Sequence, residues 1–404
     1  MRIAYLIPEF PGQTHIWMWR EMVHLREWGA QIVLFSTRHP PERDRARHTF
    51  ADRAQRETIY LTDHPAAILT AALWALGTRP RALLACIWLA LTLPVEARPR
   101  WRRVLPLVAP ACLLARHMKR DRIEHLHCHT CANGAILAMM NHRLTRVPYS
   151  LTLNANLEWW GGAMAQKLGE SRFTIAIAGW MLAQIRRDFP QLAAEQAILG
   201  RIGVDTRKWT PADPPDRPYT GPTRLVSVGR LHEGKGFDVL LRAVRGVLDR
   251  GHDLSLRIIG AGPQRPELES LVRDLHLGDT VTFLGSLSED QIIEQLHEAD
   301  VFVLASHEEP LGVVYMEAMA LGVATIGTSA GGVSEIIDDG RNGLLTPPRQ
   351  ADRLVESIIR LVRDRHLRRS LAAAGRRTIV ARFDSRLGAA VLYERLTGVK
   401  PCLS

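Results

Sequence analysis

The order of apolar and polar positions near the start of the chain predicts a strand, a helix and a second strand. A mainly apolar run covers residues 2–7 and ends at Pro8, as in a strand that is buried on both faces of a sheet. A helical pattern then covers 16–28 and ends at Gly29, and another apolar run covers 31–36. This order of elements is typical of the opening of a parallel α/β sheet.

The same order returns in the second half of the chain. We expect strands at 224–228, 254–259, 281–284 and 301–304, with helices at 236–250 and 289–298. A chain of 404 residues is too long for one ordinary core, so the repeated pattern predicts two α/β domains.

A stretch rich in proline separates the two patterns. Residues 206–222 contain five prolines, which exclude a helix and favour an extended linker. We therefore predict an N-terminal domain over 1–205 and a C-terminal domain over 223–380. The rest of the chain, 381–404, is expected to form a helix that crosses back to the N-terminal domain.

The N-terminal domain carries a helical, basic insertion at about residues 66–122. Its apolar runs, 66–77 and 82–95, are shorter than the roughly 18–20 residues needed to span a bilayer. Tryptophans and closely spaced arginines accompany them, which indicates helices that lie on an anionic membrane surface. A helical hairpin packed on the sheet, with its arginines in solvent, is the alternative interpretation.

Charge supports an anionic partner for the first half of the chain. Residues 1–205 hold 26 Lys and Arg against 16 Asp and Glu, whereas residues 206–404 hold 26 of each, so the net charge of +10 comes from the first half. This excess of positive charge indicates an anionic binding partner, which would be phosphate, nucleic acid or a lipid surface. Five cysteines do not make a disulfide framework, and the N-terminus does not resemble a signal peptide, so we expect a cytoplasmic protein.

The most informative segment follows the strand expected at 301–304. Residues 306–310 form a loop at the carboxyl end of that strand, where ligands bind in doubly wound sheets. A helix then opens, and its N-terminal backbone amides favour an anion. The residues that supply these amides are Leu311, Gly312 and Val313.

Charged side chains stand in two such loops. Glu309 and Glu317 are eight residues apart, a little over two helical turns, so they lie on roughly one side, where carboxylates can accept hydrogen bonds from vicinal hydroxyls. The loop at 229–236, which also follows a strand and precedes a helix, carries Arg230 and Lys235. These two cations would balance the charges of a diphosphate.

These segments resemble the family-4 retaining glycosyltransferases of the GT-B fold. The most specific mark is the pair Glu309 and Glu317 within an E-x-x-G-x-x-x-x-E-A-M-A-x-G frame. The likeness covers nearly the whole chain and is strongest over 224–347. It implies an α/β fold of two Rossmann-like domains whose parallel sheets face a central cleft.

The resemblance also implies roles for single residues. The catalytic candidates are Glu309, which would contact the hydroxyls of the donor sugar, and Arg230 and Lys235, which would hold the diphosphate. Glu317 would contact the ribose. The other donor-binding candidates are the loop glycine Gly12, Leu284 near the base, and the amides of Leu311, Gly312 and Val313.

The loop at 8–15, the H-x-H strand end at 125–127 and the G-V-D turn at 203–205 resemble the exopolysaccharide and colanic-acid branch of this family. We place His127, His129 and Asn154 on the acceptor side. Asn154 stands where the family commonly has a histidine, and because an amide cannot titrate, a general base at that position is excluded. His125, His127 and His129 project to one side of a strand, but a closed zinc site lacks a second cluster of ligands. The favoured interpretation is a row of histidines that either form hydrogen bonds within the protein or lie on the acceptor side. We expect no metal.

The expected function is transfer of a hexosyl group, with retention, from a UDP- or GDP-sugar to a lipid-linked or polysaccharide acceptor. No further cofactor and no nucleic acid are expected. The basic first half would hold the protein peripherally on the inner face of the plasma membrane. The alternatives are a non-catalytic nucleotide-sugar-binding component of a polysaccharide assembly complex and a sugar-nucleotide epimerase on the same fold.

Overall fold

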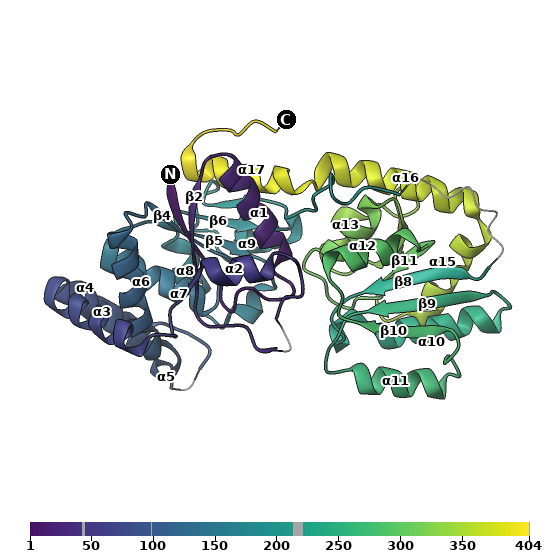
Figure 1. The fold of residues 1–404 in the computed structure, drawn as a ribbon, viewed down its shortest axis with the longest axis horizontal. Helices are drawn as coiled ribbons and strands as arrows, with labels where there is room; N and C mark the ends of the chain where they lie inside the picture. The colour runs from purple at the N-terminus through teal and green to yellow at the C-terminus, as the bar shows by residue number, and fades with distance from the viewer. Residues whose placement is uncertain (43–44, 98, 213–220, 404) are drawn as a thin grey trace. The chain divides into compact units, whose positions relative to one another are not determined.

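Buried apolar runs of the sequence form two parallel sheets in the computed structural model, which describes residues 1–42, 45–97, 99–212 and 221–403. The chain divides into two compact units (Figure 1). Unit 1 comprises 1–201 and 388–404, and unit 2 comprises 202–387. The predicted fold class, two Rossmann-like α/β domains with parallel sheets, is confirmed.

The sheet of unit 1 has the strand order β3-β2-β1-β4-β5-β6-β7, and its pairs are parallel. The interior strand β1 is buried from Ile3 to Leu6, because helices cover both faces of such a sheet. The strands are β1 (Arg2–Leu6), β2 (Gln31–Ser36), β3 (Thr58–Tyr60), β4 (His125–Cys128), β5 (Tyr149–Leu153), β6 (Phe173–Ala176) and β7 (Ala197–Leu199).

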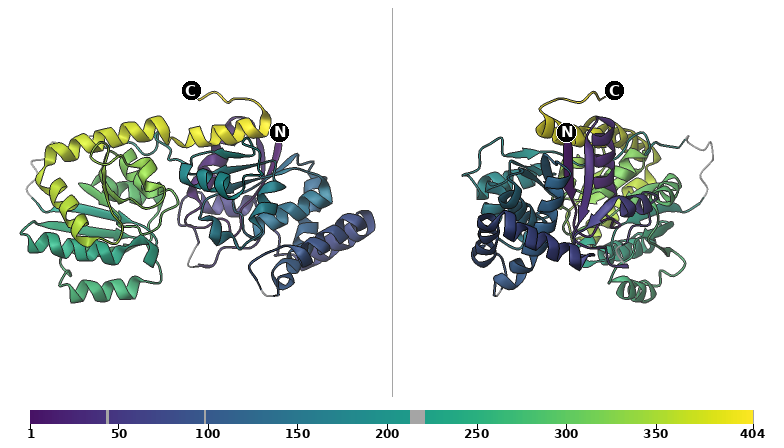
Figure 2. Two further views of the ribbon diagram at one scale, coloured as in Figure 1. Left: turned by 180° about the vertical axis from the view of Figure 1, so that it is seen from behind. Right: turned by 60° about the vertical axis from the view of Figure 1, so that its left-hand side comes forward.

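The insertion predicted between β3 and β4 is helical. The hairpin of α3 and α4 packs on α6 and α7 and lies at the outer edge of unit 1, beyond α6 (Figures 1 and 2). The helices of this unit are α1 (Ile16–Glu27), α2 (Ala51–Glu57), α3 (Pro65–Thr78), α4 (Pro80–Thr92), α5 (Trp101–Val104), η2 (Leu105–Leu107), α6 (Val108–Arg120), α7 (Asn133–Thr145), η3 (Leu157–Trp160), α8 (Met164–Gly169) and α9 (Gly179–Asp188), with α17 (Ser385–Thr397) added at the C-terminus.

The sheet of unit 2 has the order β10-β9-β8-β11-β12-β13, again with parallel pairs. Helices α10 and α11 cover one face and α12 and α13 the other (Figure 1). The strands are β8 (Thr223–Val228), β9 (Leu254–Ile259), β10 (Val281–Gly285), β11 (Val301–Val303), β12 (Ala324–Thr328) and β13 (Leu344–Thr346). The helices are η4 (Glu233–Lys235), α10 (Phe237–Asp249), α11 (Arg265–Asp274), α12 (Glu289–His297), α13 (Val313–Ala320), α14 (Val333–Ile336), α15 (Ala351–Arg363) and α16 (Arg365–Arg382).

The units divide at other residues than the predicted domains. Residues 202–205, which we assigned to the N-terminal domain, belong to unit 2. Residues 388–404 lie within the segment that we expected to return to the N-terminal domain, and they belong to unit 1. Part of the predicted linker, 213–220, lies outside the described residues. Unit 2 begins at an earlier residue than the predicted C-terminal domain because a backbone bridge joins Val204 to Asp384. This bridge ties the start of unit 2 to its end.

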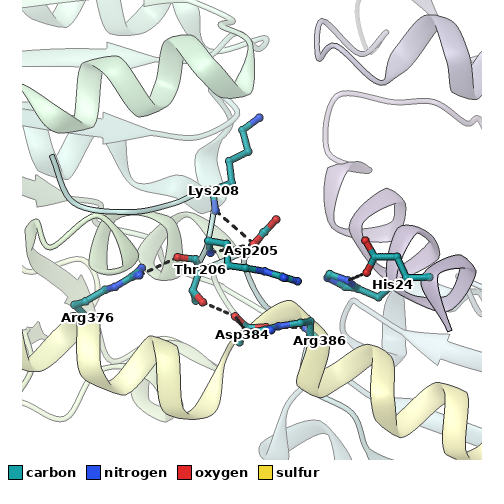
Figure 3. Close-up of polar contacts among 9 residues, drawn as sticks. His24, Asp205, Thr206, Lys208, Arg376, Asp384 and Arg386 are labelled. Carbon is teal, nitrogen blue, oxygen red and sulfur yellow. Dashed lines mark hydrogen bonds and ion pairs between the residues drawn. The ribbon is translucent and has the colours of Figure 1, made fainter. Parts of the chain in front are cut away.

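Arg376 on α16 contacts two other stretches of unit 2, and Figure 3 shows its contact with Thr206. Its guanidinium donates to the carbonyl oxygens of Trp209, Ala320 and Thr206 at 2.5, 2.7 and 2.8 Å. The Thr206 hydroxyl in turn donates to a carboxylate oxygen of Asp384. One cation therefore satisfies carbonyls from the segment after Val204 and from the end of α13.

Replacing Arg376 with methionine should lower the free energy of unfolding of the chain by about 2–4 kcal/mol, because three carbonyls lose a charged donor. Chemical denaturation measures the change. The matched control is Arg377→Met on the same helix, where the side chain is exposed and the loss should stay within about 0.5 kcal/mol. Equal losses in the two variants would contradict the role of Arg376.

Candidate functional site

Unit 2 has a topological switch point between β8 and β11. The chain leaves β8 toward β9 on one side and leaves β11 toward β12 on the other, while β8 and β11 are neighbours, with Leu225 opposite Val301. In open parallel sheets, ligands bind in the crevice outside the carboxyl ends of the strands at such a point. Two loops meet there, at 229–236 after β8 and at 304–312 after β11.

Lys235 and Glu309 form an ion pair between these two loops. Their side chains are 18% and 8% exposed, so both charges are largely removed from water. The hydroxyl of Ser306 lies 3.4 Å from the same carboxylate oxygen of Glu309 and donates to it. The structure thus brings together two of the three predicted catalytic residues, although 74 residues separate them in the sequence.

Backbone contacts hold the two loops against each other. The amide of His307 donates to the carbonyl of Gly234 at 2.8 Å. Gly236 has φ +64°, and an added Cβ there would lie 2.1 Å from the carbonyl oxygen of Ala305. Only glycine therefore allows this approach, which sets the position of the neighbouring Lys235.

A second turn holds Glu309 from the other side. Gly331 has φ +52°, and a Cβ there would lie 2.2 Å from the carbonyl oxygen of Glu309. The amide of Gly332 donates to that carbonyl at 2.9 Å. This turn therefore packs against the backbone of Glu309.

The remaining predicted donor residues of unit 2 lie on the same elements. Arg230 is exposed in the loop after β8, and Leu284 is partly exposed near the end of β10. Leu311 is buried, Gly312 has φ +100° at the N-cap of α13, and Val313 begins that helix. Glu317 is 7% exposed within α13. Donor contacts for these residues remain predictions from the resemblance.

Unit 1 has its own switch point between β1 and β4. The loop after β1 carries Gly12, which is buried and whose amide donates to Nδ1 of His15 at 3.0 Å. The ring of Phe10 stacks on the same histidine, with centroids 5.8 Å apart. His129 follows β4, so the loops after these two strands again leave the sheet at one edge.

His127 and His129 lie in a buried polar cluster that the sequence did not reveal in full. Nε2 of His129 lies 2.9 Å from Oε1 of Glu21, and the hydroxyl of Tyr5 donates to the same oxygen at 2.7 Å. The rings of His127 and His129 meet edge to face at 4.6 Å. Glu21 comes from α1, and no spacing in the sequence relates it to β4.

Glu21, His127 and His129 are also a set of metal-type ligands, with ligating atoms within 4.8 Å of one another. However, hydroxyls engage both ring nitrogens of His127. Ser150 Oγ lies 2.8 Å from Nδ1, and Thr152 Oγ1 lies 3.0 Å from Nε2. A metal ion would have to displace one of these hydrogen bonds.

Burial keeps several of these histidines neutral. Burial, with a smaller effect of His129, lowers the pKa of His15 to about 4. Burial, with a smaller effect of Arg172, lowers the pKa of His125 to about 3. The pKa of His127 is also held well below its ordinary value, first by burial and then by its two histidine neighbours.

The free energy of unfolding should therefore fall as the pH drops below about 6.5, the ordinary histidine value. Below that value the unfolded chain binds protons that the folded His15, His125 and His127 do not, until the pH reaches the folded pKa. Each of these histidines should lower the free energy of unfolding by up to about 1.4 kcal/mol for every pH unit between about 6.5 and its folded pKa. Above about pH 6.5 it should have no effect. Urea unfolding at about pH 7 and pH 5 measures the difference.

The matched pair for this experiment is His125→Gln and His64→Gln. His125 is fully buried, whereas His64 is exposed before α3. The first variant should reduce the pH-dependent loss by up to about 2 kcal/mol between pH 7 and 5, and the second should leave it unchanged. The same pH dependence in all three proteins would contradict the argument.

Asn154 lies directly after β5, in unit 1, and is partly exposed. An asparagine cannot accept a proton at any ordinary pH, and the structure leaves that conclusion unchanged. The exposed Trp159 follows in η3, the segment that begins at Leu157. An acceptor-side role for Asn154, His127 and His129 remains a prediction.

Comparisons with known proteins agree with this architecture. The family model described as "Glycosyl transferases group 1" matches residues 212–378. A curated GDP-mannose-dependent alpha-(1-6)-phosphatidylinositol monomannoside mannosyltransferase of Mycobacterium tuberculosis is 32% identical over 48% of this chain and 54% of its own. The putative colanic acid biosynthesis glycosyltransferase WcaL of Escherichia coli is 32% identical over 41% of each chain. The chain thus spans about half the length of these curated relatives.

The likeness in fold extends further along the chain. The crystal structure of Anabaena Alr3699/HepE in complex with UDP superposes with a TM-score of 0.74 and 16% identity, covering 99% of this chain and 100% of that one. At this identity the likeness concerns the fold alone. Residues 212–378 are therefore similar in sequence to the group 1 glycosyl transferases, and the two-unit fold of the chain resembles that of GT-B glycosyltransferase structures.

Proposed function

We propose that this chain transfers a hexosyl group from a UDP- or GDP-sugar, with retention, to a lipid-linked or polysaccharide acceptor on the cytoplasmic face of the plasma membrane. The observation that carries the proposal is the ion pair of Lys235 and Glu309, which stands at the switch point of a group 1 domain. This pair supplies a cation for a phosphate and a carboxylate for sugar hydroxyls within one site.

The donor is held by charges on the two loops of unit 2. Lys235 and the exposed fork of Arg230 balance the diphosphate, and the first backbone amides of α13 add a positive helix end. Glu309 accepts hydrogen bonds from the hydroxyls of the sugar, and Glu317 from those of the ribose. Because Lys235 is largely buried, its charge acts in a medium of lower dielectric than water.

The transfer needs no protein base at Asn154. The bond between the anomeric carbon and the diphosphate oxygen breaks, and a bond from the same carbon to the acceptor oxygen forms on the same face. The acceptor's proton passes to the leaving diphosphate oxygen, whose charge Lys235 and Arg230 stabilise. The scheme uses no further cofactor or metal.

Relatives support the choice of partners. The mycobacterial mannosyltransferase acts, by its name, on a phosphatidylinositol mannoside and depends on GDP-mannose. The WcaL relative is assigned to colanic acid biosynthesis, and the HepE structure contains UDP. These three names support a nucleotide-sugar donor and an acceptor that is a lipid or a polysaccharide.

Two assays test the proposal in sequence. Thermal unfolding in a panel of UDP- and GDP-sugars should single out the donor, because a ligand stabilises the folded state according to its affinity. The radiolabelled form of that sugar, incubated with membrane extract, should then label an extracted lipid or polysaccharide. Donor binding without transfer or hydrolysis would favour the non-catalytic component instead, and conversion of the donor without acceptor would favour an epimerase.

A further inference from the structure

The hairpin of α3 and α4 has an inner face of mostly small, buried residues. Ala71 and Ala75 on α3 are fully buried, as are Cys86 and Ala90 on α4. The thiol of Cys86 donates to the carbonyl of Met140 at 3.5 Å, which anchors α4 on α7. The hairpin therefore packs on α6 and α7 through this face, while large apolar side chains remain on its outer side.

The outer face consists of large apolar side chains in solvent. They recur every three or four residues, which places them in one stripe along each helix. They are Leu69, Leu73 and Leu76 on α3, exposed by 62, 58 and 58%, and Leu84, Trp88 and Leu91 on α4, exposed by 65, 68 and 51%. Single exposed leucines are ordinary, but six on two adjacent helices make a patch that indicates a partner.

The charges around this patch are positive. Residues 65–92 contain no Asp or Glu, and their charged residues are Arg79 and Arg81 at the bend of the hairpin. An open cavity of about 490 Å³ lies at this bend, lined by these two arginines together with Arg143 and Arg146. Arg143 is already paired with Glu170, at 2.6 and 2.7 Å, and Arg79 donates to the carbonyl of Leu144 at 2.9 Å. Arg81 and Arg146, both exposed, are therefore the cations most open to a ligand.

A second basic and aromatic segment adjoins the hairpin. Helix α5 contacts α4, and its Trp101 is 45% exposed. The guanidinium of Arg102 lies over the ring of Trp101 at 5.6 Å, and Arg100 is exposed beside them. Tryptophan and arginine side chains at the edge of an apolar surface are typical of protein segments that lie at the boundary between lipid headgroups and acyl chains.

We propose that the α3–α4 hairpin lies in the surface of an anionic bilayer, with its outer face among the acyl chains and a lipid phosphate in the cavity of Arg81 and Arg146. Of the helices in the described part of the chain, none combines the length and apolar character that crossing a bilayer requires, so the hairpin lies along the surface. The inference rests on the proposed membrane location and names the surface responsible for it.

Vesicle sedimentation of the whole chain, without donor or acceptor, tests the inference. The protein should bind vesicles of phosphatidylcholine mixed with phosphatidylglycerol. The exposed pair Leu73→Ser/Trp88→Ser should lower the partition coefficient at least about tenfold, because two large side chains no longer enter the lipid. Arg81→Gln/Arg146→Gln should lower it about tenfold on the mixed vesicles and less on pure phosphatidylcholine, because the choline cation of that lipid neutralises its headgroup phosphate.

Matched controls separate lipid binding from other effects. Val399→Ser removes an apolar side chain that is 58% exposed elsewhere in unit 1, and Arg186→Gln/Arg187→Gln removes two exposed arginines on α9. Both should bind as the original chain does, and all variants should keep its melting temperature.

Three results would overturn the inference. They are a lack of vesicle binding by the original chain, unchanged binding by the serine variant, and a dimer in lipid-free solution that the serine variant dissociates. The last would assign the patch to a second copy of the chain. None of these results depends on sugar transfer, so the proposed reaction can stand or fail separately.

Discussion

A chain with methionine in place of Lys235 should transfer sugar at least about 100-fold more slowly, because a charge preorganised for the leaving diphosphate is lost. Its donor affinity should fall as well. Lys235 is largely buried beside Glu309, so no water-exposed cation can replace it at the same place. Calorimetry with the donor and an initial-rate transfer assay measure the two effects. Unchanged donor affinity would show that the phosphate site lies elsewhere.

The Lys235→Met variant would also lose transfer activity if Glu309, left buried without its partner, destabilised the protein. The double variant Lys235→Met/Glu309→Gln removes that charge too, so its stability should recover toward that of the original chain. Under the proposal its transfer rate should not recover, since both side chains contact the donor. Recovery of transfer in the double variant would mean that the ion pair is only structural.

The control for Lys235 lies at the other edge of the same two strands. Arg224 at the start of β8 pairs with Asp300, just before β11, at 3.2 Å. Arg224→Met therefore breaks an ion pair between the same neighbouring strands, but at their amino ends. It should lower the melting temperature and leave the transfer rate within about threefold, since ligands bind at the carboxyl edge.

Alanine at position 236 should destabilise unit 2 by about 3 kcal/mol or more and lower donor affinity at least about tenfold. The added Cβ would lie 2.1 Å from the carbonyl oxygen of Ala305, on a backbone with φ +64°. The loop after β8 must move away from the loop after β11 to relieve this contact. Because Lys235 is the preceding residue, its ammonium group then moves away from Glu309. Denaturation and donor calorimetry measure the two effects.

Gly251 provides the matched control at the other end of α10. It has φ +76°, and an added Cβ meets no atom of the described residues within 4 Å. Gly251→Ala should therefore cost only the left-handed backbone strain, about 1–2 kcal/mol, with donor affinity unchanged. If both glycine variants lost the same stability and the same affinity, close contact between the two loops would not be what positions Lys235.

The sequence was sufficient to predict the elements that place the site. Apolar runs predicted strands at 2–7, 31–36, 254–259 and 301–304, and the structure has strands within one residue of each bound. These runs can be recognised because a parallel strand is buried on both faces and must be apolar throughout. The loops that follow the strands were therefore recognisable as well, with the polar residues in them.

Only the tertiary structure decided which of those residues meet. The ion pair between Lys235 and Glu309 depends on β8 and β11 being neighbours, although two other strands lie between them in the sequence. Glu21 on α1 meets His129, the residue after β4, and no local pattern in the sequence predicts this contact. Likewise, the hairpin at 65–92 is apolar on nearly every side in the sequence, and only its packing separates a buried face from an exposed one. Local composition determines secondary structure and burial on average, whereas contacts between distant residues follow from strand order and helix packing.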